Sequence, residues 1–96
     1  MADNVEEAVN RVRNPRLVQL NITYKGENGD LPDAMDIDSA DGDVKQIATE
    51  AVRTGYVPGI TADPNVNFRD FVVERFAAKD ALPARLFLRP KTEFGR

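Results

Sequence analysis

The most regular apolar spacing in the chain predicts a helix over residues 42–54. Its apolar members recur at intervals of three and four residues: Val44, Ile47, Ala48, Ala51 and Val52. Side chains at these intervals share one side of an α-helix. Ser39 or Asp41 is expected to cap the first turn. Gly55 is expected to end the helix, because glycine adopts the left-handed conformation without a steric penalty.

Strict alternation of apolar and polar residues predicts two strands, over 17–24 and 85–89. The inward residues of the first strand are Val18, Leu20, Ile22 and Tyr24. In the second strand Leu86 and Leu88 are expected to point inward and Phe87 outward. Each of these strands should therefore have one buried face and one wetter face.

Two weaker strand patterns are expected at 34–38 and 68–76. The first would turn Met35 and Ile37 inward, while the second is apolar on both faces. Its two predicted faces are Phe71 with Val73, and Phe68 with Val72 and Phe76. Glycine, proline and asparagine are frequent between the predicted elements. They predict turns or loops at 25–30, 56–67 and 77–83.

Residues 3–13 carry a shorter helical pattern, which Asn14-Pro15 would stop. Its apolar stripe consists of Val5, Ala8, Val9 and Val12. The segment is interpreted either as a helix that docks a partner or as an extension that frays or packs on the domain surface.

The predicted order is hairpin, crossover helix and further strands, which indicates an α+β domain with one helix across a mixed sheet of four to five strands. A chain of this length supports a single core. We expect an N-terminal extension at 1–15, the domain at 16–90 and a polar tail at 91–96.

Composition narrows the possible functions of these 96 residues. The formal net charge is −3 at pH 7, and the 13 Lys and Arg residues are not clustered. Nucleic-acid binding needs such clusters, so nucleic acid is not an expected partner. With no cysteine and no histidine, disulfides, thiol nucleophiles and imidazole or thiolate metal sites are excluded. No enzymatic activity, cofactor or metal is expected, and no feature of the sequence indicates a catalytic pocket.

The hydropathy pattern contains no stretch of the roughly 20 apolar residues that a membrane-spanning helix requires. Charged residues are mixed into the first fifteen positions, which is not the pattern of a secretory signal peptide. The chain is expected to be cytoplasmic and not to bind membranes.

Two segments of the sequence resemble ubiquitin and its relatives. The run Asp36-Ile37-Asp38-Ser39-Ala40-Asp41-Gly42-Asp43-Val44-Lys45 resembles the ubiquitin passage from the second strand into the helix. The run Ala84-Arg85-Leu86-Phe87-Leu88-Arg89 resembles the last ubiquitin strand. This resemblance, over roughly residues 16 to 95, implies the β-grasp fold of the ubiquitin-like family, possibly in a bacterial modifier.

The resemblance implies that the chain is a protein modifier or carrier whose C-terminal glycine is activated and conjugated. Gly95 would be the conjugated residue, and Arg96 would first be removed in processing. The implied partners are an E1-like activating enzyme, a conjugating enzyme and a JAB-type peptidase. The tail departs from ubiquitin in having Phe94, not a second glycine, before Gly95. A β-grasp adaptor that is not conjugated, and a sulfur carrier, remain alternatives.

Partner binding is expected on the open face of the sheet. The apolar members of the predicted patch are Phe71, Val73 and Phe87, with Arg69, Arg75 and Arg89 around them and Lys91 and Phe94 in the tail. Aromatic residues ringed by arginine are typical of protein-interaction hot spots. Alternatively, the N-terminal segment or a neighbouring subunit covers this face.

Overall fold

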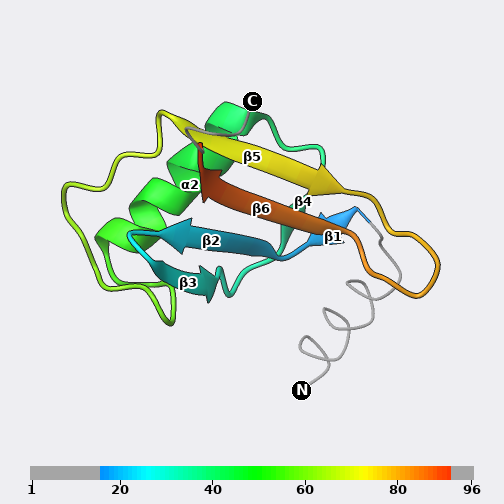
Figure 1. Ribbon diagram of the computed structural model, residues 1–96, viewed down its shortest axis with the longest axis horizontal. Coiled ribbons are helices and arrows are strands. Elements are labelled where there is room, and N and C mark those ends of the chain that lie inside the picture. Colours follow the sequence, from blue (N-terminus) through cyan, green and yellow to red (C-terminus); the bar gives the residue numbers. More distant parts are fainter. Residues whose placement is uncertain (1–15, 92–96) are drawn as a thin grey trace, which may run out of the picture.

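A computed structural model of the chain describes residues 16–91 (Figure 1). The helix predicted at 3–13 and the tail beyond Lys91 lie outside this range. The elements in chain order are β1 (Leu17–Val18), β2 (Leu20–Tyr24), β3 (Glu27–Asp30), β4 (Met35–Asp36), α2 (Asp41–Arg53), β5 (Phe71–Phe76) and β6 (Arg85–Pro90).

Four strands form a sheet in the order β3-β2-β6-β5. The pairs β2–β3 and β5–β6 are antiparallel, whereas β2 and β6 are parallel. A second, two-stranded ribbon joins β1 to β4. Over residues 16–91 the fold is therefore α+β, with one helix and a mixed four-stranded sheet, and the prediction is confirmed at this level.

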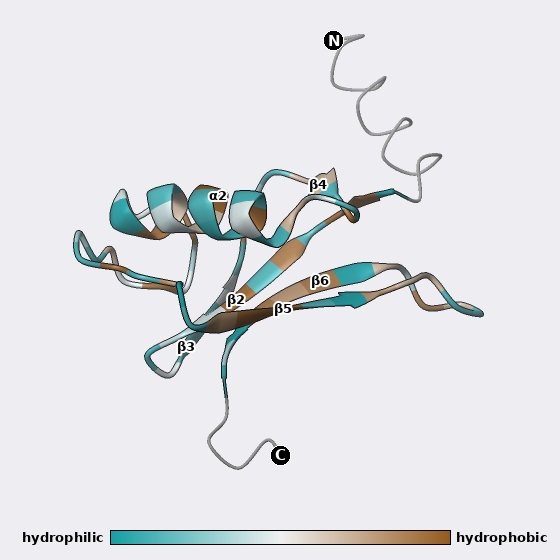
Figure 2. Cartoon of the chain, turned by 90° about the horizontal axis from the view of Figure 1, so that it is seen from above, coloured by the Kyte–Doolittle hydropathy of each residue, from teal (hydrophilic) through white to brown (hydrophobic). Residues whose placement is uncertain are grey.

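The helix α2 crosses one face of the sheet, with β4 on the same side as the helix (Figure 2). Its buried residues are Val44, Ala48, Ala51 and Val52. At the C-terminal end the Gly55 N–H donates to the carbonyl of Val52, and the Tyr56 N–H donates to that of Ala51. Gly55 has φ +75°, which confirms its predicted role as the left-handed residue that ends the helix.

The expected cap at the start of α2 is wrong. The N-cap residue is Ala40, and no side chain caps the first turn. Asp41 and Asp43 lie inside that turn, where negative charge is favourable because of the partial positive charge at a helix N-terminus. Charge in the first turn therefore takes the place of a side-chain cap.

The core lies between α2 and the sheet. Its largest fully buried side chains are Phe68, Leu20, Ile22, Leu86, Leu88, Val44, Val52 and Val57. Full burial of an aliphatic or aromatic side chain of this size contributes about 1.5–3 kcal/mol. Since Leu20, Ile22, Leu86 and Leu88 come from β2 and β6, the two central strands carry the main contact with the helix.

The turn predicted over 25–30 is too long. Tyr24 pairs with Glu27, so the turn consists of Lys25 and Gly26, with φ of 51° and 79°. Two consecutive positive φ values are typical of the type I′ turn, whose twist matches that of paired strands. The rest of the predicted turn forms β3.

The strand predicted at 34–38 is shorter, because only Met35 and Asp36 pair, with Val18 and Leu17. The two halves of the predicted strand 17–24 are also separated, at Gln19. Pro32, between β3 and β4, has no N–H to donate to a ladder. The hairpin is therefore interrupted at this position.

Phe68 belongs to the core and not to the strand that follows it. Its side chain is 1% exposed, and its ring meets Tyr24 and Phe71 edge to face at centroid distances of 5.3 and 4.8 Å. The Phe71 N–H donates to the Phe68 carbonyl over 2.9 Å. The predicted strand 68–76 therefore begins at Phe71.

None of the helices within residues 16–91 has the length and apolar character needed to cross a membrane.

Candidate recognition surface on the open face of the sheet

The pairing of β5 with β6 shows which of their side chains face away from α2. Because Leu86 and Leu88 are buried, their partners Arg75 and Val73 face the helix. The alternate residues therefore form the open face. On these two strands they are Val72, Glu74 and Phe76 of β5, and Arg85, Phe87 and Arg89 of β6.

An aromatic pair links β5 to β6 on this face. The rings of Phe76 and Phe87 meet nearly at right angles, with centroids 5.5 Å apart. The guanidinium groups of Arg85 and Arg89 lie 5.1 and 4.4 Å from the centre of the Phe87 ring. These are cation–π distances. We call Val72, Phe76, Arg85, Phe87 and Arg89 the aromatic–arginine patch.

The patch is accessible and carries mainly positive charge. Phe76 is 51% exposed and Val72 40%, which is high for large apolar side chains. The nearby carboxylate of Glu74 pairs with Arg89 over 3.4 Å, and its Oε1 atom has no hydrogen-bond donor. Two arginines against one carboxylate make this a basic area on an acidic chain, which favours an acidic partner surface.

The other half of the open face is polar. Asn21 of β2 donates to the side chains of Asn28 and Asp30 of β3 over 3.0 and 2.8 Å. Asn28 in turn donates to Thr23 over 3.0 Å. These groups satisfy one another, so we do not include them in the recognition surface.

Three residues of the predicted patch lie on the opposite face, which corrects the sequence analysis. Phe71 and Val73 are half-buried against the core. Arg75 donates to the carbonyls of Ile37 and Ser39 and forms an ion pair with Asp41. The sequence pattern predicted the two faces of β5 the wrong way round. Only the β5–β6 register shows which residues of β5 pair with the buried leucines of β6. Of the predicted set, Phe87 and Arg89 lie in the patch.

Val72, Phe76 and Arg85 were not predicted as site residues. The signal for the first two was present in the sequence, since both lie on one side of a strand whose other side, with Phe71 and Val73, is equally apolar. A strand that is apolar on both faces is typical of burial on both sides. Here one of these faces is open, so its apolar residues become the candidate contacts.

The last strand positions the chain end. Leu86 and Leu88 are 0% exposed, and β6 pairs with β2 on one side and β5 on the other. Arg89, Pro90 and Lys91 directly after them are exposed. The chain therefore leaves the sheet from a central strand anchored in the core. Phe94, Gly95 and Arg96 lie outside the described residues.

Asp63 lies outside the patch and is the centre of a cluster of hydrogen bonds that shifts its pKa. Its carboxylate accepts hydrogen bonds from the Tyr24 hydroxyl over 2.6 Å, from the Asn65 N–H over 2.9 Å and from Lys25 over 3.2 Å. These contacts, the tyrosine first, lower the pKa of Asp63 to about 2. The same contact with Asp63 raises the pKa of Tyr24. This cluster attaches the loop after α2 to the end of β2.

Three acidic residues from the end of β4 to the start of α2 form ion pairs with arginines. Arg16 pairs with Asp36 over 3.2 Å and with Asp38 over 3.0 Å, and Asp41 pairs with Arg75 over 2.7 Å. Within residues 16–91 no group of three or more acidic side chains is arranged to hold a metal ion.

No protein-family model, curated protein or solved structure matches the chain significantly. The structure itself defines a small α+β domain with a mixed sheet. The open face of this sheet carries the aromatic–arginine patch, and its last strand in the chain, β6, lies between β2 and β5.

Proposed function

We propose that this domain is a β-grasp fold and that the chain is a ubiquitin-like modifier or carrier, joined to its targets through Gly95. The observation that carries the proposal is the position of β6. A central strand, parallel to β2 and fixed by two fully buried leucines, ends in three exposed residues. A chain end that starts from such an anchor is presented outward while the domain stays folded.

The aromatic–arginine patch supplies the recognition surface of this proposal. It includes residues of the strand that leads into the tail, since Phe87 lies in β6 and Arg89 directly precedes Pro90. A partner bound on the patch is therefore beside the path of the tail. The partners would be the activating enzyme, the conjugating enzyme and the peptidase, all in the cytoplasm.

The chemistry takes place on the tail and is catalysed by the partners. The peptidase hydrolyses the peptide bond between Gly95 and Arg96, which leaves Gly95 with a free carboxylate. The Gly95 carboxylate then attacks the α-phosphate of ATP, which forms an acyl adenylate and releases pyrophosphate. A thiol of the enzyme displaces AMP, and a lysine amine of the target displaces that thiol. Glycine at this position avoids a Cβ in a narrow active site.

The proposal is tested with the full chain, ATP and a candidate peptidase and activating enzyme, monitored by intact-mass spectrometry. We expect loss of Arg96, followed by a thioester to the enzyme that dithiothreitol reverses. A variant that lacks Arg96 should form the thioester without the peptidase, and Gly95→Pro should form none. A thioester from Gly95→Pro, or none from the variant without Arg96, would contradict the proposal.

A non-conjugated adaptor is the second candidate, and a specific observation favours it. The aromatic–arginine patch is built entirely from β5 and β6 and does not depend on the tail. For an adaptor, partner binding would be lost in Phe87→Ala and kept when residues 92–96 are deleted. For a modifier, the same deletion would abolish transfer to targets.

A further inference from the structure

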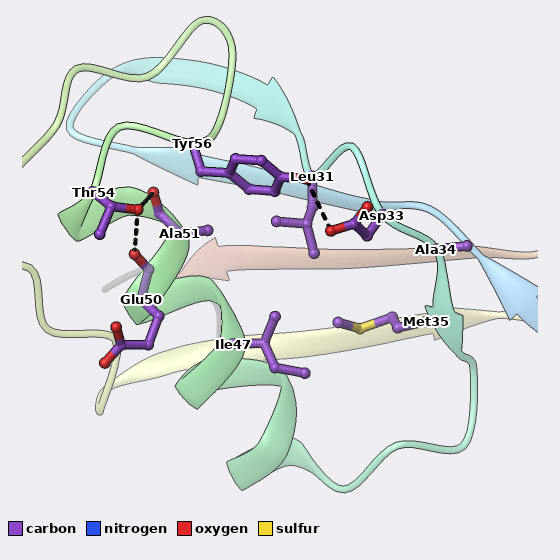
Figure 3. A pocket seen from close by; sticks show the side chains of 9 residues that line it. All are labelled: Leu31, Asp33, Ala34, Met35, Ile47, Glu50, Ala51, Thr54 and Tyr56. Atoms are coloured by element: carbon purple, nitrogen blue, oxygen red, sulfur yellow. Dashed lines mark hydrogen bonds between the residues drawn. The ribbon is translucent and has the colours of Figure 1, made fainter.

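A shallow groove with a volume of about 410 Å³ lies beside α2, on the helix side of the molecule (Figure 3). Ile47, which was predicted to be buried, is 43% exposed in this groove, and that prediction is wrong. The polar groups around it are paired: the Tyr56 hydroxyl donates to Asp33 over 3.0 Å, and the Glu50 carboxylate pairs with Arg53. With these groups paired, the groove offers apolar contacts but does not indicate which ligand would fill it.

The edges of the four-stranded sheet are more informative. These edges are β3 and β5. β3 packs against the loop after α2, because a Cβ at Gly59 would lie 2.6 Å from the Asn28 carbonyl oxygen. The Thr61 N–H also donates to the Glu27 carboxylate over 2.7 Å. On the outer side of β5, by contrast, no further strand pairs within residues 16–91 (Figure 1). The β5 edge is therefore open in this part of the chain.

The pairing with β6 shows which backbone groups of β5 point to the open edge. Pro90 has no N–H, so Phe71 and Pro90, which lie opposite each other, do not exchange two hydrogen bonds. The Phe71 N–H donates to the Phe68 carbonyl instead. Bonded and non-bonded pairs alternate along an antiparallel ladder. The pairs that contain Val73 and Arg75 are therefore also of the non-bonded kind.

A second contact supports this assignment. Leu86, the partner of Arg75 in the ladder, donates its N–H to the Gln19 carbonyl over 3.5 Å, so that this N–H is directed away from β5. The N–H and C=O groups of Val73 and Arg75 thus point away from β6. Within residues 16–91 no backbone hydrogen bond from another segment reaches them. The open edge offers two donors and two acceptors in an extended geometry, which an extended backbone can satisfy.

β5 has few of the features that prevent an edge strand from pairing, such as proline, lysine, a bulge or a very short length. It has six residues without proline, glycine or lysine, and its register with β6 is unbroken. On its open face Val72 and Phe76 are 40% and 51% exposed. Arg75 is an inward-pointing charge that could oppose pairing, but Asp41 neutralises it over 2.7 Å.

The side chains beside the open edge indicate what the added segment should contain. On the open face, an added strand would lie next to Val72, Glu74 and Phe76. The Glu74 side chain is 40% exposed and its partner Arg89 lies 3.4 Å away, so a second cation has access to it. Arg89 itself belongs to β6, one strand further from the edge. Opposite charges stabilise cross-strand pairs and like charges destabilise them, so the matching segment is apolar, basic and apolar at alternate positions.

We propose that the edge of β5 binds an extended, antiparallel segment of another protein, with apolar side chains opposite Val72 and Phe76 and a lysine or arginine opposite Glu74. In this recognition mode the backbone hydrogen bonds give affinity and the alternate side chains give specificity. A second copy of the chain fits less well. Two antiparallel β5 strands that match Val72 with Phe76 would place Glu74 opposite Glu74. The inference does not depend on Gly95 or on conjugation.

The probe for this site is a synthetic peptide with blocked ends and the sequence Thr-Val-Thr-Lys-Thr-Val-Thr, added at millimolar concentration to the ¹⁵N-labelled full chain. We expect the amide signals of Val73 and Arg75 to shift and their exchange with solvent to slow. Asn28, on the covered edge, should keep its signal. The matched control peptide carries N-methyl groups on the two threonines beside the lysine. It has the same side chains without these N–H donors, and it should cause no shift.

An exchange of charge tests the residue opposite Glu74. Replacing the central lysine of the peptide by glutamate should weaken binding to the wild type by about two- to fivefold. In Glu74→Lys the preference between the two peptides should reverse. Glu50→Lys makes the same change of charge on α2 and should leave the preference as in the wild type.

Several outcomes would overturn the inference: no shift at Val73 and Arg75, equal binding of the N-methylated peptide, or an unchanged preference in Glu74→Lys. The free chain is measured first, in concentrated and in dilute solution. Slow exchange of Val73 and Arg75 without peptide would show that the edge is already occupied, by a second copy if dilution restores fast exchange, and this too would overturn it. A failed thioester assay leaves the inference intact, because the peptide experiments involve neither ATP nor the tail.

Discussion

Phe76 and Phe87 form an edge-to-face pair although they are not opposite each other in the β5–β6 ladder. Phe76 pairs with Arg85, and Phe87 pairs with Glu74, so the two rings meet diagonally at a centroid distance of 5.5 Å. Diagonal neighbours on one face of a sheet are within reach of aromatic side chains. The pair therefore joins the edge strand β5 to the central strand β6 on the open face of the sheet.

We predict that Phe87→Ala reduces charging of the chain by its activating enzyme far more than it affects folding. An aromatic pair contributes about 0.5–1.5 kcal/mol beyond its buried area, whereas loss of an interface hot spot costs 2 kcal/mol or more, a factor of about 30. The measurement is the thioester formation rate at limiting substrate. Thr23→Ala, on the polar half of the same face, is the control and should charge normally. Equal losses in both variants would contradict the assignment of the patch.

The central position of β6 predicts a large stability difference between two leucines. Leu88 is 0% exposed and Leu82 71% exposed. Leu88→Ala should lower the free energy of unfolding by about 3 kcal/mol, through lost burial and the cavity left behind. Leu82→Ala should change it by no more than about 0.5 kcal/mol. Urea denaturation measures both, and a Leu88→Ala variant as stable as Leu82→Ala would be incompatible with a central β6.

Gly29 in β3 tests the contact between that strand and the loop after α2. A Cβ there would lie 2.1 Å from the carbonyl oxygen of Pro58, so Gly29→Ala must displace the backbone and should cost about 1–3 kcal/mol. Gly42 is the matched control, because a Cβ there meets nothing within 4 Å. Gly42→Ala should stabilise the helix by about 0.5–1 kcal/mol. Chemical denaturation of both variants checks the signs, and a neutral Gly29→Ala would disprove the close approach.

Asp63 predicts a specific dependence of stability on pH. Its pKa is about 2 in the folded chain, below the ordinary value of 3.8, because the Tyr24 hydroxyl, the Asn65 N–H and Lys25 favour the carboxylate. This stabilisation is fully present above about pH 3.8 and is lost as the pH falls towards 2. Asp63→Asn should therefore be less stable than the wild type at neutral pH, with the gap narrowing in acid. Thermal melts of both proteins across this range measure it, and a constant gap would argue against the lowered pKa.

The sequence predicted α2 and β6 well, because both carry one unbroken period over their whole length. It did not predict β3. Residues 27–30 include Asn28 and Gly29, which are common in turns. The reason for glycine in that strand is tertiary, since a loop distant in sequence approaches it at Pro58. Local propensity does not contain this information.

The candidate site was predicted in part for a similar reason. Phe87 and Arg89 follow directly from the alternation in β6, where the buried leucines identify the inner face. In β5 both faces are apolar, and only the pairing of Val73 with Leu88 shows which one is covered. The exposure of Ile47 could not be predicted either. Helical periodicity shows that Ile47 belongs to the apolar stripe of α2, but it does not show how much of that stripe the sheet covers.

Peptide mapping of conjugates tests the modifier proposal most directly. Trypsin cleaves after Lys91, so a target lysine joined to Gly95 would keep the four-residue branch Thr92-Glu93-Phe94-Gly95 on its side chain. We predict this branch on lysines of proteins that co-purify covalently with the chain under denaturing conditions. Recovery of the C-terminus solely as residues 92–96 with Arg96 still attached, and no branched lysine, would contradict the account.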